Sequence, residues 1–388
     1  MNELEELKTI TQQTLQLRSR DNFAVGAVPT RPPRWAYADK NLFDLEKSEL
    51  FGRRPLLVGF SCDIPKPGDF FTFDDLQVPV LITRDKQGNA NAMLNICSHR
   101  AARLKEGNGN ARSISCPYHA WNFGLDGKLK KIFKEDSFGE VDKCDYDLQT
   151  LPCAEKYGLL FISLDADAEL DIDQHLGDLA PWFEMWDLMQ MDFIDQYQWQ
   201  AKGNWKHALD TLFKDYRGMA SANTTNTDRV LETVADDERF GPDQQHHRLT
   251  FANNALLELR DSDPGTWIAK QLHSVQRVHF LFPNISLLIS QTAVELFVLY
   301  PGEEPGRHST RYRAYRRTDT KTIASSEQAQ THFETMRDLI EENNQPLADG
   351  HEHSARDDTD QTPSAVMNMQ RSCLVAVGID PDSPARPN

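Results

Sequence analysis

Two cysteines and two histidines lie close together in residues 95–121, NICSHRAARLKEGNGNARSISCPYHAW. Cys97 precedes His99 by two residues, and Cys116 precedes His119 by three. Thiolate and imidazole ligands at this spacing can hold either one tetrahedral zinc ion or a two-iron, two-sulfide cluster. In the cluster the two cysteines would bind one iron and the two histidines the other. The stretch therefore predicts a metal centre.

Short β-rich runs surround these four residues. PLLVGF, DFFTF, VPVLITR and ANAMLNI lie between residues 55 and 96, separated by PKPGD, DDLQ and DKQGN, and YGLLFISL follows at 157–164. Such alternation of strand-forming and turn-forming segments predicts a small antiparallel β domain. The four ligands would lie on loops of that domain, which favours a cluster over a short zinc knuckle.

The two pairs resemble the loops of the Rieske ferredoxin-like domain, which read CxHR and CPYHxW and are matched here by residues 97–100 and 116–121. The resemblance implies a Rieske [2Fe-2S] cluster. Histidine ligation places its potential at roughly −150 to +300 mV, against about −400 mV for a plant-type cluster, which suits the transfer of single electrons. The implied ligands are Cys97, His99, Cys116 and His119.

The chain changes in composition after the β domain. Helical periodicity is found at 179–191 and at 203–221, and a polar, acidic stretch at 222–246 is expected to be a surface loop or lid. Strand-like runs then lie between residues 248 and 318, and two helices are expected near 325–343 and 363–376. These elements predict a second domain of α+β class, an antiparallel sheet flanked by helices.

An N-terminal Rieske domain followed by a larger α+β domain resembles the large (alpha) subunit of Rieske non-heme iron oxygenases. The segment Gly203-Asn204-Trp205-Lys206 is similar to the start of the family's iron-binding helix, and Phe282-Pro283-Asn284 to a strand motif of its catalytic sheet. The resemblance implies a helix-grip, catalytic-type second domain. The expected divisions are an N-terminal helix and loop at 1–49 packing on the C-terminal domain, the Rieske domain at 50–165 and the catalytic-type domain at 166–388.

The iron-binding part of this helix departs from the family pattern, which runs approximately NWKxxxENxxExYH with a second histidine four or five residues later. Arg217 stands at the first histidine, Ser221 or Ala222 at the second, and Lys214 at the bridging carboxylate. Arginine stays protonated and has no lone pair for iron. A cation about 4 Å away would oppose a divalent ion by roughly 8 kcal/mol at an effective dielectric constant near 20. We therefore predict that the mononuclear iron site is lost.

A displaced set of iron ligands is the alternative to that loss. His207 lies on the same helix but is more simply a core or surface histidine, and the pair at 246–247 is more simply solvated. Three aspartates at 357, 358 and 360 fall near the family's carboxylate position and could instead pair with Lys214 or Arg217. The weak candidates are His207, His246, His247, Asp357, Asp358 and Asp360.

Three functions are consistent with an intact cluster and a changed helix. The leading hypothesis is a partner subunit of a heteromeric, trimer-based Rieske oxygenase, a component of an oxidoreductase that passes electrons to the iron of a homologous neighbour. That neighbour would hydroxylate or demethylate a small organic substrate with O2. The alternatives are a self-sufficient oxygenase with a displaced triad, and a structural or regulatory pseudo-subunit whose cluster only stabilises the fold.

Basic residues outnumber acidic ones around the ligands, with seven between Cys97 and Lys131 against Glu106 and Asp126. This excess is either ordinary loop charge or a docking patch for an acidic electron donor, such as a ferredoxin or flavin reductase. The docking candidates are Arg100, Arg103, Lys105 and Arg112, and the remaining three basic residues are Lys128, Lys130 and Lys131.

The chain of 388 residues carries a formal net charge of −17, which would repel nucleic acid phosphates. No apolar run approaches the roughly 20 residues needed to cross a bilayer. The first 23 residues predict an amphipathic acidic helix without the apolar core of a signal peptide. We expect a soluble, cytoplasmic protein in which paired cysteines and histidines serve a metal rather than disulfides.

Overall fold

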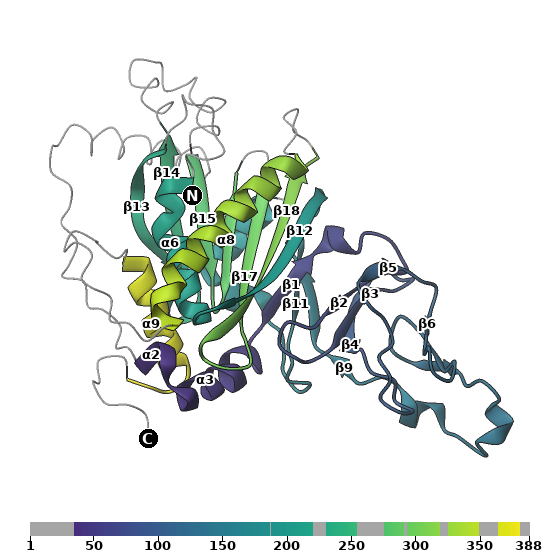
Figure 1. Cartoon of the computed structure of the whole chain (residues 1–388). Helices are drawn as coiled ribbons and strands as arrows, with labels where there is room; N and C mark the ends of the chain where they lie inside the picture. The colour runs from purple at the N-terminus through teal and green to yellow at the C-terminus, as the bar shows by residue number, and fades with distance from the viewer. Residues whose placement is uncertain are drawn as a thin grey trace, which may run out of the picture. The chain divides into compact units, whose positions relative to one another are not determined.

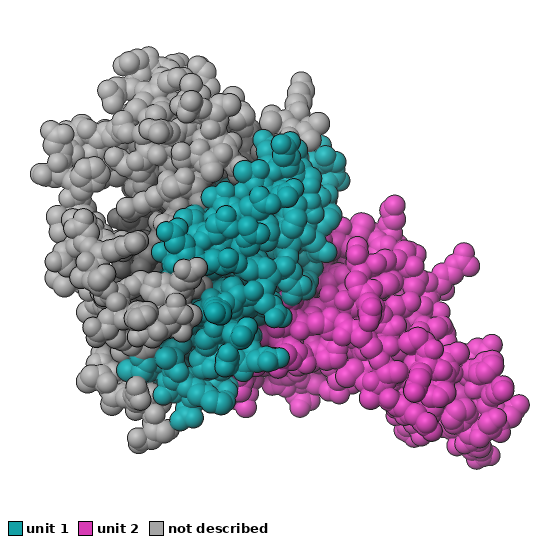
Figure 2. Space-filling model, in the orientation of Figure 1, with its two compact units in different colours: residues 1–46, 192–388 teal, residues 47–191 magenta. Residues whose placement is uncertain are grey.

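The structure, a computed structural model, describes residues 35–186, 188–219, 230–253, 275–290, 293–318, 325–348 and 364–380. The chain forms two compact units (Figure 2). Unit 2 comprises Lys47–Met191, and unit 1 comprises Met1–Glu46 together with Asp192–Asn388. The predicted N-terminal helix over the first 23 residues lies outside the described residues.

Unit 2 is built from short antiparallel strands, as the sequence predicted. Its largest sheet has the order β5-β2-β3-β4-β9, and two smaller sheets have the orders β1-β11-β10 and β6-β7-β8. The strands are β1 (Leu56–Phe60), β2 (Asp69–Phe73), β3 (Val80–Arg84), β4 (Ala90–Leu94), β5 (Asn108–Asn110), β6 (Ile114–Ser115), β7 (Asn122–Phe123), β8 (Leu129–Lys131), β9 (Thr150–Leu151), β10 (Cys153–Lys156) and β11 (Leu159–Ile162).

Short helices complete unit 2. They are η1 (Lys47–Phe51), η2 (Ser61–Asp63), η3 (Glu135–Ser137), η4 (Lys143–Tyr146), α4 (Ile172–Leu176), η5 (Gly177–Leu179) and α5 (Ala180–Trp186). The sequence predicted a domain boundary near residue 166, whereas the compact unit extends to Met191. The extension results from packing, because the buried His175 lies edge-on to Phe161 at 5.9 Å between ring centroids, and Tyr157 donates a hydrogen bond of 2.6 Å to Asp173.

Unit 1 contains a seven-stranded sheet of order β12-β18-β17-β16-β15-β14-β13, antiparallel from β13 to β18. In Figure 1 helices α6 and α8 lie across one face of this sheet, and α6 also packs against α9. The strands are β12 (Met191–Lys202), β13 (Val230–Phe240), β14 (His246–Asn253), β15 (Val275–Leu281), β16 (Ile285–Ile289), β17 (Ala293–Pro301) and β18 (Arg307–Arg317). The helices are α2 (Trp35–Ala38), α3 (Lys40–Glu46), α6 (Trp205–Met219), η6 (Pro242–Gln244), α8 (Ser326–Ala348) and α9 (Ser364–Ala376).

This arrangement confirms the α+β class and the two C-terminal helices but corrects two local predictions. The acidic stretch expected to be a loop contains β13, which pairs along β14 at the edge of the sheet. Phe282-Pro283-Asn284 is the turn between β15 and β16 rather than part of a strand. Among the described residues no helix is both long enough and apolar enough to span a membrane.

Candidate metal centre and helix α6

The two loops that carry the predicted ligands have the same backbone construction. In the first loop Ala101 donates to the Cys97 carbonyl at 2.9 Å, and Cys97 donates to the Ala102 carbonyl at 2.8 Å. In the second loop Ala120 and Cys116 make the equivalent bonds, to Cys116 at 3.1 Å and to the Trp121 carbonyl at 2.8 Å. Each loop is closed by an alanine with a φ of 54°, a left-handed conformation that costs a non-glycine residue of order 1–3 kcal/mol.

The ligand side chains of the two loops meet. Cys97 and Cys116 are buried in the apolar core of unit 2, and the rings of His99 and His119 lie 4.9 Å apart between centroids. The Nδ1 atoms of both histidines are buried, and neither has a hydrogen-bond partner within the described part of the chain. Such orphaned atoms each cost about 1–3 kcal/mol unless something binds them. Coordination to iron would satisfy both, so the donor set fits the group that the sequence predicted.

A cluster and a single zinc ion would need different arrangements of these side chains. Within the described residues no group of three or more His, Cys, Asp or Glu side chains is placed to hold one metal ion. A tetrahedral zinc site would need all four side chains around one centre, whereas a two-iron cluster needs only two protein ligands for each iron.

Protonation in this pocket depends on its burial. Burial raises the pKa of the Cys97 thiol, and the neighbouring Cys116 raises it further, so the thiol stays protonated without iron. Burial lowers the pKa of His99, and the nearby His119 and Arg100 add to the effect. A neutral imidazole keeps a lone pair for a metal, and binding iron would release the thiol proton.

Aromatic side chains hold the first histidine in place. Trp121 is buried and stacks on His99 at 4.7 Å with an angle of 3° between the ring planes. Phe138 lies edge-on to both rings, and the ring centroids of Tyr146 and Trp121 are 5.3 Å apart. Ser98 ties its loop to η4 by donating a hydrogen bond of 2.7 Å to the Tyr146 carbonyl. Sequence reasoning did not single out Phe138 or Tyr146, because no pattern links 138 and 146 to the loops.

The four docking candidates differ in how available their charges are. Arg103 forms an ion pair with Asp74, and Lys105 is half-buried with its ammonium 5.2 Å above the Phe70 ring centroid. Arg100 and Arg112 are exposed and make no ion pair within the described residues. A docking role for these four residues stays a prediction.

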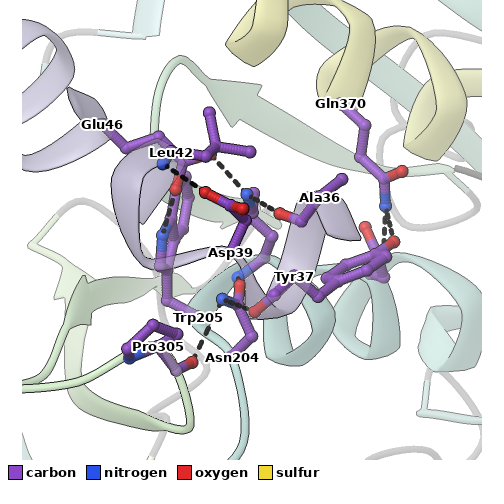
Figure 3. Close-up of polar contacts among 11 residues, drawn as sticks. Ala36, Tyr37, Asp39, Leu42, Glu46, Asn204, Trp205, Pro305 and Gln370 are labelled. Atoms are coloured by element: carbon purple, nitrogen blue, oxygen red, sulfur yellow. Dashed lines mark hydrogen bonds and ion pairs between the residues drawn. The ribbon is translucent and has the colours of Figure 1, made fainter. Parts of the chain in front are cut away.

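Helix α6 begins with the motif that resembles the iron-binding helix. Gly203 has a φ of 111°, a backbone conformation that glycine tolerates, and Asn204 caps the helix by accepting a hydrogen bond of 2.9 Å from the Lys206 backbone N–H. The Asn204 side chain also donates to the carbonyls of Tyr37 at 2.7 Å and Pro305 at 3.1 Å (Figure 3). Asn204 therefore holds the start of α6 and also binds helix α2, which contains Tyr37.

Lys206 and Trp205 extend these contacts to α3. The Lys206 ammonium forms an ion pair with Glu46 and donates to the Ala36 carbonyl, and the Trp205 indole N–H donates to Glu46 at 3.3 Å. The charged side chains are only 3% and 1% exposed. Burial raises the pKa of Glu46, and Lys206 opposes that shift. Removing one partner of such a pair leaves a buried charge uncompensated.

Asp210, one turn further along α6, joins three segments of the chain. It accepts a hydrogen bond of 2.9 Å from the Tyr37 hydroxyl and another from the Gln370 amide of α9. Gln370 also donates to the Tyr37 hydroxyl (Figure 3). Burial and the adjacent Asp210 raise the pKa of Tyr37 far above its usual range, so the phenol stays neutral. The matching residues Asn204, Trp205 and Lys206 thus anchor residues 35–46, and Asp210 adds the contact with α9.

The altered positions of the motif lie further along the chain. Lys214 and Arg217 are on α6, three residues apart, but their side chains are outside the described residues. Outside the description too are Ser221, Ala222, Asp357, Asp358 and Asp360. The loss of the mononuclear site therefore stays a prediction.

The histidine candidates occupy different environments. His207 is half-buried in the first turn of α6, edge-on to Tyr37. His246 and His247 are fully buried in β14, so the prediction that they are solvated is wrong. The inner position of β14, between β13 and β15, explains their burial. The His246 Nδ1 atom accepts a hydrogen bond of 3.0 Å from the Phe282 backbone N–H, which gives this ring a structural role.

Sequence reasoning also missed further buried histidines, of which His308 lies near α6. His308 on β18 is 1% exposed, and burial lowers its pKa to about 4, with a further contribution from His207. Neither ring nitrogen of His308 makes a hydrogen bond of normal length and angle within the described residues. No local spacing signalled it, because β18 and α6 are brought together only by the fold.

Known proteins share both the metal centre and the fold. Residues 54–152 match the family model of the Rieske [2Fe-2S] domain, which includes all four predicted ligands. The glycine betaine monooxygenase oxygenase subunit of Pseudomonas aeruginosa is 32% identical over 197 residues, 50% of this chain and 44% of that protein. The biphenyl 2,3-dioxygenase subunit alpha of Rhodococcus jostii is 35% identical over 196 residues, 49% of this chain and 42% of that protein.

Solved structures resemble nearly the whole chain. The quaternary ammonium Rieske monooxygenase CntA in complex with L-carnitine has a TM-score of 0.69 at 19% identity, covering 89% of this chain and 94% of that one. Naphthalene 1,2-dioxygenase with indole bound has a TM-score of 0.66 at 19% identity, covering 88% and 90%. At this identity the likeness establishes the fold, and the sequence matches span less than half the length of the curated relatives.

Proposed function

We propose, for a chain that carries a Rieske [2Fe-2S] domain and is homologous to alpha subunits of Rieske oxygenases, that it is the cluster-bearing partner in a heteromeric oxygenase. The observation that carries the proposal is the contrast between complete ligand loops and Arg217 at the helix position where the family has histidine. When bound, the cluster accepts one electron and passes it on. This chain would hold it through Cys97, His99, Cys116 and His119.

This role defines the partners. A ferredoxin or flavin reductase would supply electrons, and a homologous subunit in a trimer-based ring would receive them at its own mononuclear iron. That subunit would hydroxylate or demethylate a small organic substrate with O2 in the cytoplasm. The similar proteins include a glycine betaine monooxygenase subunit and a biphenyl 2,3-dioxygenase subunit, so the comparisons do not narrow the class of substrate.

Iron and acid-labile sulfide, measured per chain on protein purified alone without oxygen, test the proposal. We expect two irons with two sulfides, because only the Rieske loops would bind iron. Three irons with two sulfides would overturn the proposal in favour of a self-sufficient oxygenase with a displaced triad. Its third iron would then have to be held by residues other than those at Lys214 and Arg217.

Electron delivery needs a separate test in the assembled complex. We expect Cys116→Ser to abolish turnover by a complex whose partner subunit keeps its own iron. The matched control is Cys153→Ser, which removes a thiol from the same unit at a half-buried position outside the cluster loops. Unchanged turnover in Cys116→Ser would instead identify a structural pseudo-subunit.

A further inference from the structure

The charge around the cluster loops changes sign along the chain. Nine basic and eight acidic residues lie between Cys97 and Asp147, so residues 132–147 nearly cancel the basic excess that precedes them. The segment at 133–147, which we term the acidic segment, contains two lysines and six carboxylates. Those carboxylates are Glu135, Asp136, Glu140, Asp142, Asp145 and Asp147.

Exposed aromatic side chains gather at the same place. Seven large apolar side chains are exposed among the described residues, and four of them belong to the acidic segment or the second cluster loop. Their exposed fractions are 71% for Tyr118, 56% for Phe133, 42% for Phe138 and 37% for Tyr146. Tyr118 lies edge-on to His119 at 4.7 Å, and Phe138 to His99 at 5.7 Å. The acidic segment therefore lies against His99, and together with Tyr118 it presents apolar surface to solvent there.

Half of the carboxylates in the acidic segment have partners within unit 2. Glu135 forms an ion pair of 3.0 Å with Lys143. Asp142 accepts a hydrogen bond of 3.0 Å from the Cys144 backbone N–H, and Asp147 accepts one of 2.7 Å from Leu129. The other three are exposed and have no ion pair or hydrogen bond from the described residues. They are Asp136, Glu140 and Asp145.

We propose that the acidic segment is the docking surface for an electron-transfer protein whose own docking face is positively charged around an apolar centre. This inference rests on the proposed function, because it names the chemistry of the partner that exchanges electrons with the cluster. Aromatic residues that are partly exposed supply the contact area from which binding energy comes, and the unpaired carboxylates select the sign of the partner.

The rest of the chain reinforces that sign. Its net charge of −17 attracts a basic protein over long distances and raises its rate of encounter. The basic residues between Cys97 and Lys131 form the competing docking surface. Its positive charge is smaller than the sequence indicates, because Arg103 is paired with Asp74 and Lys130 with Asp126. An acidic donor on the basic residues is therefore the alternative that an experiment must distinguish.

Mitochondrial cytochrome c, a basic haem protein, is the probe. The holoprotein is reduced and then mixed at low ionic strength with ferricytochrome c, so that one electron passes from the reduced cluster to the ferric haem. The variant Asp136→Lys/Glu140→Lys/Asp145→Lys is expected to lower the bimolecular rate about tenfold and to weaken its dependence on salt. With hexacyanoferrate(III), an anionic oxidant, the same variant should react faster than the unchanged protein.

The control is a second triple variant of unit 2, Asp167→Lys/Glu169→Lys/Asp178→Lys, which alters the net charge equally at three exposed carboxylates outside the acidic segment. We expect it to change the cytochrome c rate by less than about twofold, because the Debye length limits the reach of exposed charges. An equal loss of the cytochrome c rate in both variants would overturn the proposed docking surface, because the total charge alone would then account for the rates. A faster reaction of the first variant with cytochrome c would also overturn it.

Binding without electron transfer separates this inference from the proposed function. Titration calorimetry with cytochrome c at low salt should show weaker binding for the first triple variant than for the control variant. If dithionite produces no cluster bleaching in the unchanged protein, the proposed function fails, and the calorimetric comparison still tests the docking surface. If the cluster bleaches but both variants bind and react alike, the docking surface alone is wrong.

Discussion

The cluster loops and helix α6 differ in which part of a functional motif each retains. The loops keep all four predicted ligands, and the Nδ1 atoms of His99 and His119 are buried without a hydrogen-bond partner among the described residues, so both could bind a metal. Helix α6 matches the family motif at Asn204, Trp205, Lys206 and Tyr216 but not at Lys214 and Arg217. The first three of these are engaged in capping and in ion pairing. Resemblance in the loops thus reports on chemistry, whereas resemblance at the start of α6 reports on packing.

This contrast is consistent with the proposed loss of the iron site, because the retained start of the motif has a packing role of its own. The buried contacts of Lys206 and Asp210 hold residues 35–46 and α9, so they are needed whether or not iron binds nearby. Lys214 and Arg217 lie four and seven residues further along the chain than Asp210.

The largest expected effect is the loss of the cluster from Cys116→Ser. A serine hydroxyl replaces a thiolate that iron requires, so both irons and both sulfides should fall to near zero per chain, with the visible absorption of the cluster. Cys153→Ser should retain both. Because a metal centre contributes to the folding of its domain, the first variant should also unfold at a lower temperature than the second. Retention of two irons by Cys116→Ser would contradict the prediction that the two loops bind the cluster.

Breaking the buried pair in α6 should produce the next largest effect. Lys206→Met leaves Glu46 buried without its cation, which should lower the free energy of unfolding by about 3–5 kcal/mol in urea denaturation. Lys202→Met, at an exposed position just before the helix, should change it by less than about 0.5 kcal/mol. Equal losses in the two variants would show that the start of α6 is not held by this pair.

Sequence patterns predicted the elements whose formation depends on local residues. DFFTF at 69–73 coincides with β2, because aromatic and β-branched residues suit a pleated strand wherever it lies. The spacing within each cysteine and histidine pair likewise predicted a Rieske domain, which the family match at residues 54–152 confirms, since each pair lies within a loop of six residues. These predictions needed only residues that are neighbours in the chain.

Features that depend on distant segments could not be predicted in this way. VLETVADDERF was expected to be a loop because of its acidic composition, yet it forms edge strand β13 through pairing with β14. His246 and His247 looked solvated beside that stretch and are buried by the same pairing. Gln370 is 333 residues from the Tyr37 hydroxyl that it contacts, and no local pattern records such a separation.

Acid should weaken unit 1 through His308, beneath the start of α6. Its pKa is about 4 in the folded chain against an ordinary 6.5, so below pH 6.5 the unfolded chain takes up a proton that the folded chain refuses. The stability that this residue supplies is present above pH 6.5 and is lost as the pH falls towards 4, up to about 3 kcal/mol. Buried His279 contributes in the same direction.

Urea denaturation at pH 7 and pH 5 measures this effect. His308→Gln should reduce the difference in unfolding free energy between the two pH values, because a neutral amide takes up no proton. An unchanged difference would show that other groups carry the acid sensitivity of unit 1.

The smallest expected effect tests the hydrogen bonds that join α6 to α9. Tyr37→Phe removes only the hydroxyl that donates to Asp210, so the free energy of unfolding should fall by about 1–2 kcal/mol, the range for a buried bond whose partner is a carboxylate. Tyr118→Phe, at a residue 71% exposed, should leave it unchanged within about 0.5 kcal/mol. Iron content should be the same in both variants, since neither hydroxyl belongs to a ligand. A loss of iron from Tyr37→Phe alone would mean that the start of α6 still supports a metal, and the contrast between the two regions would fail.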